Sequence, residues 1–195
     1  MNLLILPFAI FSIISGGFPE FKSSALIISI SLFFEIGYPI LFFQKRIGLS
    51  GREFKIIKFR TMTNEKDKLG ELLPDFKRIT RIGKLIRKSS LDELPSLINV
   101  LIGNMSIVGP RPHPINLNRQ FKNQIGSFNK RHRFKPGITG LAQSMGYSGF
   151  IGSVQDMSDR VKMDVFYFKN WSLLLDFKIM FKTIGILFNG IFKRA

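Results

Sequence analysis

Two apolar runs near the start of the chain limit how it can fold. Residues 1–19 carry no charged side chain, and residues 23–34 again carry none. A helix that spans a hydrocarbon layer of about 30 Å needs about 20 apolar residues. The first run only just reaches that length, and Pro7 and Gly16-Gly17 interrupt it. We therefore expect an N-terminal re-entrant membrane helix-hairpin, bent around residues 16–22; the alternative is a hydrophobic hairpin packed on a soluble core.

The charge balance predicts a polyanionic partner. The chain has 29 Lys and Arg against 13 Asp and Glu, a formal net charge of +16. Nucleic acid, an anionic membrane or a phosphate-bearing substrate would each suit it. Twenty-one Phe beside one Trp and three Tyr favour lipid contact over base stacking. No reading helix, aromatic RNA platform or zinc module is recognisable, so we expect anionic membrane lipids and no nucleic acid. The alternative is a non-catalytic basic protein that binds nucleic acid or anionic lipid.

The absence of cysteine and the presence of only two histidines limit the metal and thiol chemistry available to the chain. There is no cysteine, which excludes a disulfide framework and a cysteine metal site. The two histidines, His113 and His132, lack the partners of a metal site or a nucleophile triad. We interpret both as bystanders, although His113 follows a proline-fenced loop at 110–114 and could touch a ligand.

For the fold class we expect α/β, mostly helical. Strand-like runs at 40–45 and 53–59 flank Gly48–Gly51, which predicts a small β-hairpin. Residues 82–88 predict a basic helix, and Pro136–Gly140 predicts a turn. We divide the chain into a membrane-embedded segment, 1–38, and a cytosol-facing domain, 39–195.

The C-terminal part returns to a helical pattern. An apolar stripe recurs at helical spacing: Phe177, Phe181, Ile184, Phe188 and Ile191. Lys178, Lys182 and Lys193 lie elsewhere on this helix. An aromatic face with lysines beside it predicts an amphipathic helix in the membrane interface, and core packing is the alternative.

Asp92 and Glu93 form an acidic pair in a chain that has few acids. One interpretation is structural: Ser90 and Glu93 have the S-x-x-E spacing of a capping box, with Asp92 near the positive end of a helix. The apolar spacing that follows predicts a helix with one buried face: Leu94, Leu97, Ile98 and Leu101. The other interpretation is that the pair is the reactive part of a site that binds anions.

Four cations are candidate phosphate ligands for such a site. The planar fork of arginine binds phosphate oxygens in pairs. Arg111 is held between two prolines, and Arg87 lies five residues before Asp92. Lys58 and Arg60 belong to one strand-like segment. The alternative for each cation is a solvated surface charge.

Six motifs follow one another in an order typical of one family. They are Gln44-Lys-Arg46-Ile-Gly48-Leu-Ser-Gly51-Arg-Glu-Phe54, Lys58-Phe-Arg60-Thr-Met62, Ser90-Leu-Asp92-Glu93-Leu94-Pro95, Asn99-Val-Leu-Ile-Gly103-Asn-Met-Ser106, Val108-Gly-Pro-Arg111-Pro112 and Lys135-Pro-Gly-Ile-Thr-Gly140. From about residue 39 to residue 184, the chain closely resembles the bacterial sugar transferases known as monotopic phosphoglycosyl transferases.

The resemblance implies a reaction. These enzymes move a phosphosugar from a UDP-sugar to a polyprenol phosphate, here expected to be undecaprenyl phosphate, and release UMP. The product primes a surface glycan at the cytoplasmic face of the bacterial cytoplasmic membrane. The family's nucleophile, which forms a covalent phosphosugar intermediate, corresponds to Asp92, with Glu93 beside it. Magnesium is required, and we expect Asp92 and Glu93 to hold it.

Two departures from the family pattern matter. Family members tend to have a Ser-Pro bend in the membrane helix, whereas here Pro19 comes early and Ser23-Ser24 stands near the expected place. After Gln143 they often carry Asn-Gly-Arg, whereas this chain has Ser144-Met-Gly-Tyr147. The second departure leaves the donor sugar open. An inactive relative serving as a membrane scaffold is a further alternative, and the intact Asp-Glu pair argues against it.

Overall fold

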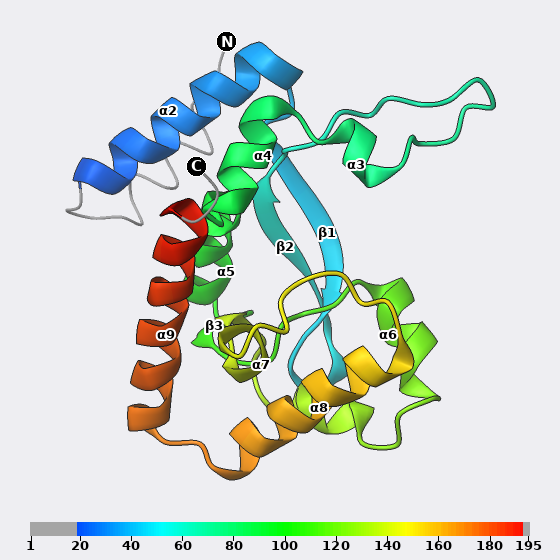
Figure 1. Cartoon of the computed structure of the whole chain (residues 1–195), viewed down its shortest axis with the longest axis vertical. Helices are drawn as coiled ribbons and strands as arrows, with labels where there is room; N and C mark the ends of the chain where they lie inside the picture. Colours follow the sequence, from blue (N-terminus) through cyan, green and yellow to red (C-terminus); the bar gives the residue numbers. More distant parts are fainter. Residues whose placement is uncertain (1–18, 193–195) are drawn as a thin grey trace. The chain divides into compact units, whose positions relative to one another are not determined.

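The computed structural model describes residues 19–192, and the side chains of residues 23–187. Internal contacts group the chain into two compact units, one of Met1–Phe42 with Ile57–Ile98 and one of Phe43–Ile56 with Asn99–Ala195. This grouping differs from the boundary expected at residue 38, which concerns membrane contact and stays a prediction. The described elements, drawn in Figure 1, are α2 (Pro19–Ile36), β1 (Leu41–Ile47), the 3-10 helix η1 (Leu49–Gly51), β2 (Glu53–Phe59), α3 (Asp75–Arg78), α4 (Arg81–Lys88), the 3-10 helix η2 (Leu91–Ser96), α5 (Leu97–Leu101), β3 (Ser106–Val108), α6 (Ile115–Lys122), the 3-10 helix η3 (Phe128–Arg133), β4 (Gly137–Thr139), α7 (Leu141–Ser144), α8 (Val154–Lys169) and α9 (Leu173–Phe192).

The fold is mostly helical with a small β-hairpin, as expected. Strands β1 and β2 form the hairpin, and η1 makes its turn. Gly48 N–H donates to the carbonyl of Arg52 at 2.8 Å. Gly51 has φ +75°, a left-handed conformation that glycine adopts without steric cost. The glycines of the 48–51 segment therefore form the predicted turn.

Helix α2 packs one apolar face into the core of the first unit. Ala25, Ile28 and Leu32 are buried there, in one cluster with Phe59 and Ile86, among others. The second apolar run is therefore helical, and it runs through Ser23-Ser24 without a break. Residues 1–18, the first arm of the expected hairpin, lie outside the described residues. Within residues 19–192, none of the helices combines the length and the apolar character that a membrane-crossing segment requires.

Helix α4 packs against α2 (Figure 1), and two side chains cap its N-terminus. Thr80 Oγ1 accepts a hydrogen bond from Gly83 N–H at 2.9 Å. The Glu35 carboxylate, in the last turn of α2, accepts one from Ile82 N–H at 3.1 Å. A carboxylate is well placed at a helix N-terminus, where the N–H groups carry partial positive charge. The predicted basic helix at 82–88 is confirmed.

The predicted capping box at Ser90 and Glu93 is wrong. Ser90 has a left-handed backbone, φ 55°, and its side chain makes no capping hydrogen bond. The segment that follows is a 3-10 helix, η2, and only then the short helix α5. Pro95 has no N–H to donate, which disfavours a continuous α-helix across this point. The predicted buried stripe is incomplete, because Leu101 is 60% exposed.

The predicted turn at Pro136–Gly140 is also wrong. Residues 137–139 form β4, which pairs in parallel with β3 in the second unit. A Cβ on Gly137 would lie 2.2 Å from the backbone nitrogen of Gly109. The glycines therefore allow two backbones to approach closely, a use of glycine in strands that sequence alone does not distinguish from a turn.

Helix α9 turns its aromatic stripe outward. Phe177, Phe181 and Ile184 are 46%, 70% and 48% exposed, whereas Ile179 is buried beside Val108 and Tyr167. Core packing is therefore wrong for these three residues within the second unit. The side chains of Phe188 and Ile191 lie outside the described ones. The interfacial role of the stripe stays a prediction.

Gly83→Ala should destabilise the fold. A Cβ at this position would lie 2.3 Å from the Thr61 carbonyl oxygen, a backbone atom that cannot simply rotate away. We expect the free energy of unfolding to fall by about 1–3 kcal/mol, the usual range for overpacking. Gly185→Ala is the matched control, because Gly185 is also helical and nothing lies within 4 Å of its Cβ. There the better helix propensity of alanine should stabilise by up to about 1 kcal/mol. Equal shifts in chemical denaturation would contradict the close approach.

Candidate active site

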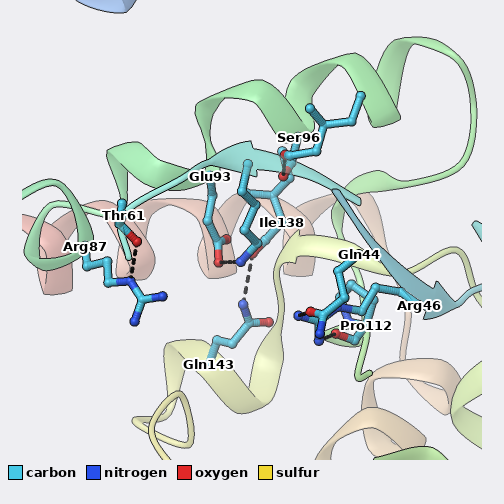
Figure 2. A network of polar contacts seen from close by, with 11 residues as sticks. Gln44, Arg46, Thr61, Arg87, Glu93, Ser96, Pro112, Ile138 and Gln143 are labelled. Carbon is cyan, nitrogen blue, oxygen red and sulfur yellow. Dashed lines mark hydrogen bonds and ion pairs between the residues drawn. The ribbon is translucent and has the colours of Figure 1, made fainter. Parts of the chain in front are cut away.

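The acidic pair lies on η2, which is tied to β2 inside the first unit. Glu93 Oε1 lies 2.6 Å from Lys58 Nζ, and both side chains are only 15% exposed (Figure 2). Ser96 Oγ donates to the carbonyl of Ile57 at 2.7 Å. Two neighbouring strand positions thus hold the middle and the C-terminal end of the same short helix. The half-buried Asp92 is the residue directly before the anchored Glu93.

Arg87 lies in the last turn of α4, which contacts η2. Its Nε donates to Thr61 Oγ1 at 2.7 Å (Figure 2), and its Nη2 lies 3.2 Å from Met62 Sδ. Thr61 is buried and belongs to the Lys58-Phe-Arg60-Thr-Met62 motif. It was not among the predicted site residues, although its place in the motif was a signal. The hydroxyl of Thr61 orients the guanidinium of Arg87.

Arg60 has a structural contact of its own. Its Nη2 donates to the carbonyls of Ile36 and Gly37, at 2.6 and 2.9 Å, at the C-terminal end of α2. The last carbonyls of a helix have no partner within the helix, and a cation there is favourable. The predicted phosphate-binding role of Arg60 stays a prediction beside this observed contact.

Arg111 lies in the second unit, in the loop between β3 and α6. It lines a small pocket whose polar lining residues are Arg111, His113, Asn118, Arg131 and His132. The two histidines were predicted to be bystanders, and the structure places both in the lining of this pocket with Arg111. The neighbouring position of His113 in the proline-fenced loop was the signal for one of them.

Burial and nearby cations both lower the pKa of His113. Its burial, followed by the charges of Arg131, Arg111, Arg160 and Arg46, lowers its pKa well below the usual value. Its Nε2 is buried without a hydrogen-bond partner among the residues that the structure describes. The second unit therefore holds several guanidinium groups within electrostatic range of one uncharged imidazole. Such an arrangement favours anionic ligands.

The two carboxylates of the acidic pair could hold a magnesium ion together with substrate phosphates. No group of three His, Asp or Glu side chains that could hold a metal ion occurs in the described part of the chain. Mg²⁺ is commonly bound through one or two carboxylates plus the phosphates of the substrate. Asp92 and Glu93, two adjacent carboxylates on η2, fit that mode, although one Glu93 oxygen already contacts Lys58.

Comparison with known proteins identifies the class. A family model described as bacterial sugar transferase matches residues 10–190. The chain belongs to this family. The resemblance inferred from the six motifs is confirmed.

Several relatives carry informative names. The chain is 44% identical over 148 residues to a UDP-glucose:undecaprenyl-phosphate glucose-1-phosphate transferase of Klebsiella pneumoniae, covering 75% of this chain and 32% of that protein. It is 45% identical over 150 residues to an uncharacterized sugar transferase, EpsL, of Bacillus subtilis, covering 77% and 70%. It is 38% identical over 174 residues to a UDP-N-acetylgalactosamine-undecaprenyl-phosphate N-acetylgalactosaminephosphotransferase of Aeromonas hydrophila, covering 88% and 41%. The chain thus spans about a third of the length of the Klebsiella relative.

A double-mutant cycle should detect strong coupling between Lys58 and Glu93. Removing either charge leaves the other poorly solvated, so Lys58→Met and Glu93→Gln should be non-additive by about 1–3 kcal/mol in the free energy of unfolding. Lys45 and Glu53 are the control pair, at 3.1 Å but with side chains 63% and 46% exposed. Lys45→Met and Glu53→Gln should couple by less than about 1 kcal/mol. Equal coupling in the two cycles would rule out a special role for burial at Lys58.

His132→Gln should reduce the acid sensitivity of the fold. Burial, then the charges of Arg131 and Lys122, lower the pKa of His132 from 6.5 to about 4. As pH falls through this window, the unfolded chain takes up a proton that the folded chain does not. Wild-type stability should therefore fall, and the variant should lose less between about pH 7 and pH 5 in thermal unfolding.

Two neighbours affect the same pH range and are retained in the variant. His113 acts in the same sense as His132, because its pKa is also lowered by burial. Asp164 acts in the opposite sense: burial raises its pKa to about 6, so the folded chain binds that proton first. The difference between wild type and variant isolates His132, and a pH-independent difference would refute its lowered pKa.

Proposed function

We propose that this chain is a phosphoglycosyl transferase that moves a sugar 1-phosphate from a UDP-sugar to undecaprenyl phosphate, releasing UMP. The observation that carries the proposal is the Asp92–Glu93 pair on η2, anchored to β2 by Lys58 at 2.6 Å from Glu93. Membership in the bacterial sugar transferase family supports it, as do the names of the relatives from Klebsiella and Aeromonas. The product would serve as the first membrane-bound intermediate of a surface glycan.

The reaction proceeds in two half-reactions. Carboxylates can act as nucleophiles toward phosphoryl groups and divide one difficult transfer into two easier ones. An Asp92 oxygen attacks the sugar-bearing phosphorus of the donor, the diphosphate P–O bond breaks, and UMP leaves. A phosphate oxygen of undecaprenyl phosphate then attacks the same phosphorus and breaks the bond to Asp92. Asp92 is restored, and the polyprenol diphosphate sugar is released.

Cations must offset the repulsion between Asp92 and an anionic donor, because phosphoryl transfer relies on positioning and charge neutralisation. The proposed phosphate ligands are Arg87 of the first unit, which Thr61 orients, and Arg111 of the second unit. Lys58 acts on Glu93, which it holds at 2.6 Å. Arg60 supports the end of α2 and lies one residue from the motif's Thr61.

We assign Mg²⁺ as the cofactor, held by Asp92 and Glu93 together with donor phosphates. When bound, it neutralises charge on the phosphate oxygens. One Glu93 oxygen contacts Lys58 at 2.6 Å, and the carboxylates of Asp92 and Glu93 are the proposed ligands.

We place the protein at the bacterial cytoplasmic membrane, with the site on the cytoplasmic face. The uncharged N-terminal run and the outward stripe of α9 support this placement. A well-placed Lys or Arg gains about 1 kcal/mol against anionic lipids, and the net charge of +16 provides many such residues.

Asp92→Asn should abolish transfer. The amide cannot act as the nucleophile, so UMP release should fall by about a thousandfold or more. Purified protein is assayed with undecaprenyl phosphate and a panel of UDP-glucose, UDP-galactose, UDP-N-acetylglucosamine and UDP-N-acetylgalactosamine. Asp75→Asn is the control, because that carboxylate is 76% exposed in the same unit.

Withholding the acceptor tests the covalent route. Donor labelled in its sugar-bearing phosphate should leave label on wild-type protein and on the Asp75→Asn variant, and none on Asp92→Asn. Membrane association should be the same in all three proteins. Undiminished turnover by Asp92→Asn would remove Asp92 from its role, and turnover without protein-bound label would exclude the intermediate.

A further inference from the structure

The loop that carries Arg111 cannot hold itself in place through its own backbone. It reads Gly109-Pro110-Arg111-Pro112, and two of these residues have no N–H to donate. It forms no helix or strand between β3 and Pro114. Pro110 and Pro112 are nevertheless buried. Buried carbonyl groups need hydrogen-bond donors, so the donors must come from elsewhere.

Three successive carbonyl groups each receive one donor. Gly137 N–H donates to the Pro110 oxygen at 3.0 Å. Arg131 Nη2 donates to the Arg111 oxygen at 2.9 Å. Arg46 Nη1 donates to the Pro112 oxygen at 3.1 Å (Figure 2). Two of the three donors are charged guanidinium groups, and hydrogen bonds to charged groups are worth more than neutral ones.

A buried arginine is an uncommon donor to a loop carbonyl, because burying a charge is costly. Its side chain is 3% exposed, and so is that of Asp164 on α8, whose Oδ2 lies 2.8 Å from Arg131 Nη2. Arg160, also buried, donates to the carbonyls of Gly149 and Phe150 and lies within electrostatic range of Asp164. Asp164 therefore supplies the counter-charge that lets Arg131 sit in the interior under the loop.

We propose that Arg46 and Arg131 are positioning residues for Arg111: they fix the backbone on both sides of its Cα, and Asp164 holds Arg131 in place. The inference rests on the proposed function, in which Arg111 binds a phosphate group of the UDP-sugar. Neither Arg46 nor Arg131 needs to touch the donor. A shift of about 1 Å in a substrate-binding group can cost about a hundredfold in rate, so fixing this backbone matters for catalysis.

The variants are chosen so that the fold survives. Removing Arg131 alone would leave Asp164 as an uncompensated buried charge, which is strongly destabilising. The double variant Arg131→Met/Asp164→Asn removes both charges together. Arg46→Met is the second test, because Arg46 is only half-buried and contributes the other guanidinium. Arg133→Met is the matched control: Arg133 is on η3 with Arg131, is exposed, and lies over the Phe168 ring.

The measurement is kcat and KM for the UDP-sugar that the wild-type protein turns over, in each variant with and without Arg111→Ala. We expect Arg46→Met and Arg131→Met/Asp164→Asn each to lower kcat/KM by roughly tenfold to a hundredfold. The loss should divide between kcat and KM as it does for Arg111→Ala. In the Arg111→Ala background both effects should largely vanish, because the group being positioned is gone. Arg133→Met should change neither constant in either background.

The outcomes separate the inference from the proposed function. Suppose that Arg111→Ala impairs transfer but that Arg46→Met and Arg131→Met/Asp164→Asn do not, or that their losses multiply with the loss caused by Arg111→Ala. The positioning role is then wrong, and the phosphate-binding role of Arg111 stands. If Arg111→Ala changes nothing, its phosphate-binding role is wrong and the inference falls with it, while the Asp92 test remains independent. Should the double variant fail to fold, as measured by thermal unfolding, Arg46→Met alone decides between these outcomes.

Discussion

The contact between Lys58 and Glu93 is the interaction on which the acidic site of the first unit depends. A single ion pair at 2.6 Å, with both side chains 15% exposed, holds a six-residue 3-10 helix against a strand. A short 3-10 helix has poor hydrogen-bond geometry and little stability of its own. Its conformation must therefore come from tertiary contacts. The Ser96 hydroxyl on the Ile57 carbonyl provides the second contact, and Asp92 directly precedes Glu93 on this helix.

Many of the chain's cations bind protein oxygens. Lys58 contacts a carboxylate, Arg60 contacts the end of α2, and Arg46 and Arg131 contact loop carbonyls. This observation changes how a net charge of +16 should be interpreted. A strongly basic composition predicts an anionic partner, but it does not identify which cations face that partner. Of the predicted phosphate ligands, Arg87 is oriented by a hydroxyl, which leaves its guanidinium with further donors.

The sequence predicted the hairpin, the basic helix α4, the helical C-terminal part and the family, because each rests on local pattern or on motif order. It failed at Pro136–Gly140, where glycines serve close strand pairing, since a glycine pattern looks the same in both uses. It failed at Ser90, because the capping-box spacing does not show that Lys58, 35 residues away along the chain, competes for Glu93. The supports of Arg111 were invisible for the same reason: each comes from a distant part of the chain.

The ion pairs of the two units differ in how deeply they are buried. In the first unit, Glu93 is held by an ammonium at partial exposure, and its neighbour Asp92 is half-buried. In the second unit, Arg131 and Asp164 are fully enclosed, and burial raises the pKa of Asp164 to about 6. A buried pair of this kind contributes little net stability, because desolvation offsets attraction. It does impose a geometry. The arrangement is therefore better explained by the loop above it, whose proline-rich backbone requires donors in fixed positions, than by a need for stability.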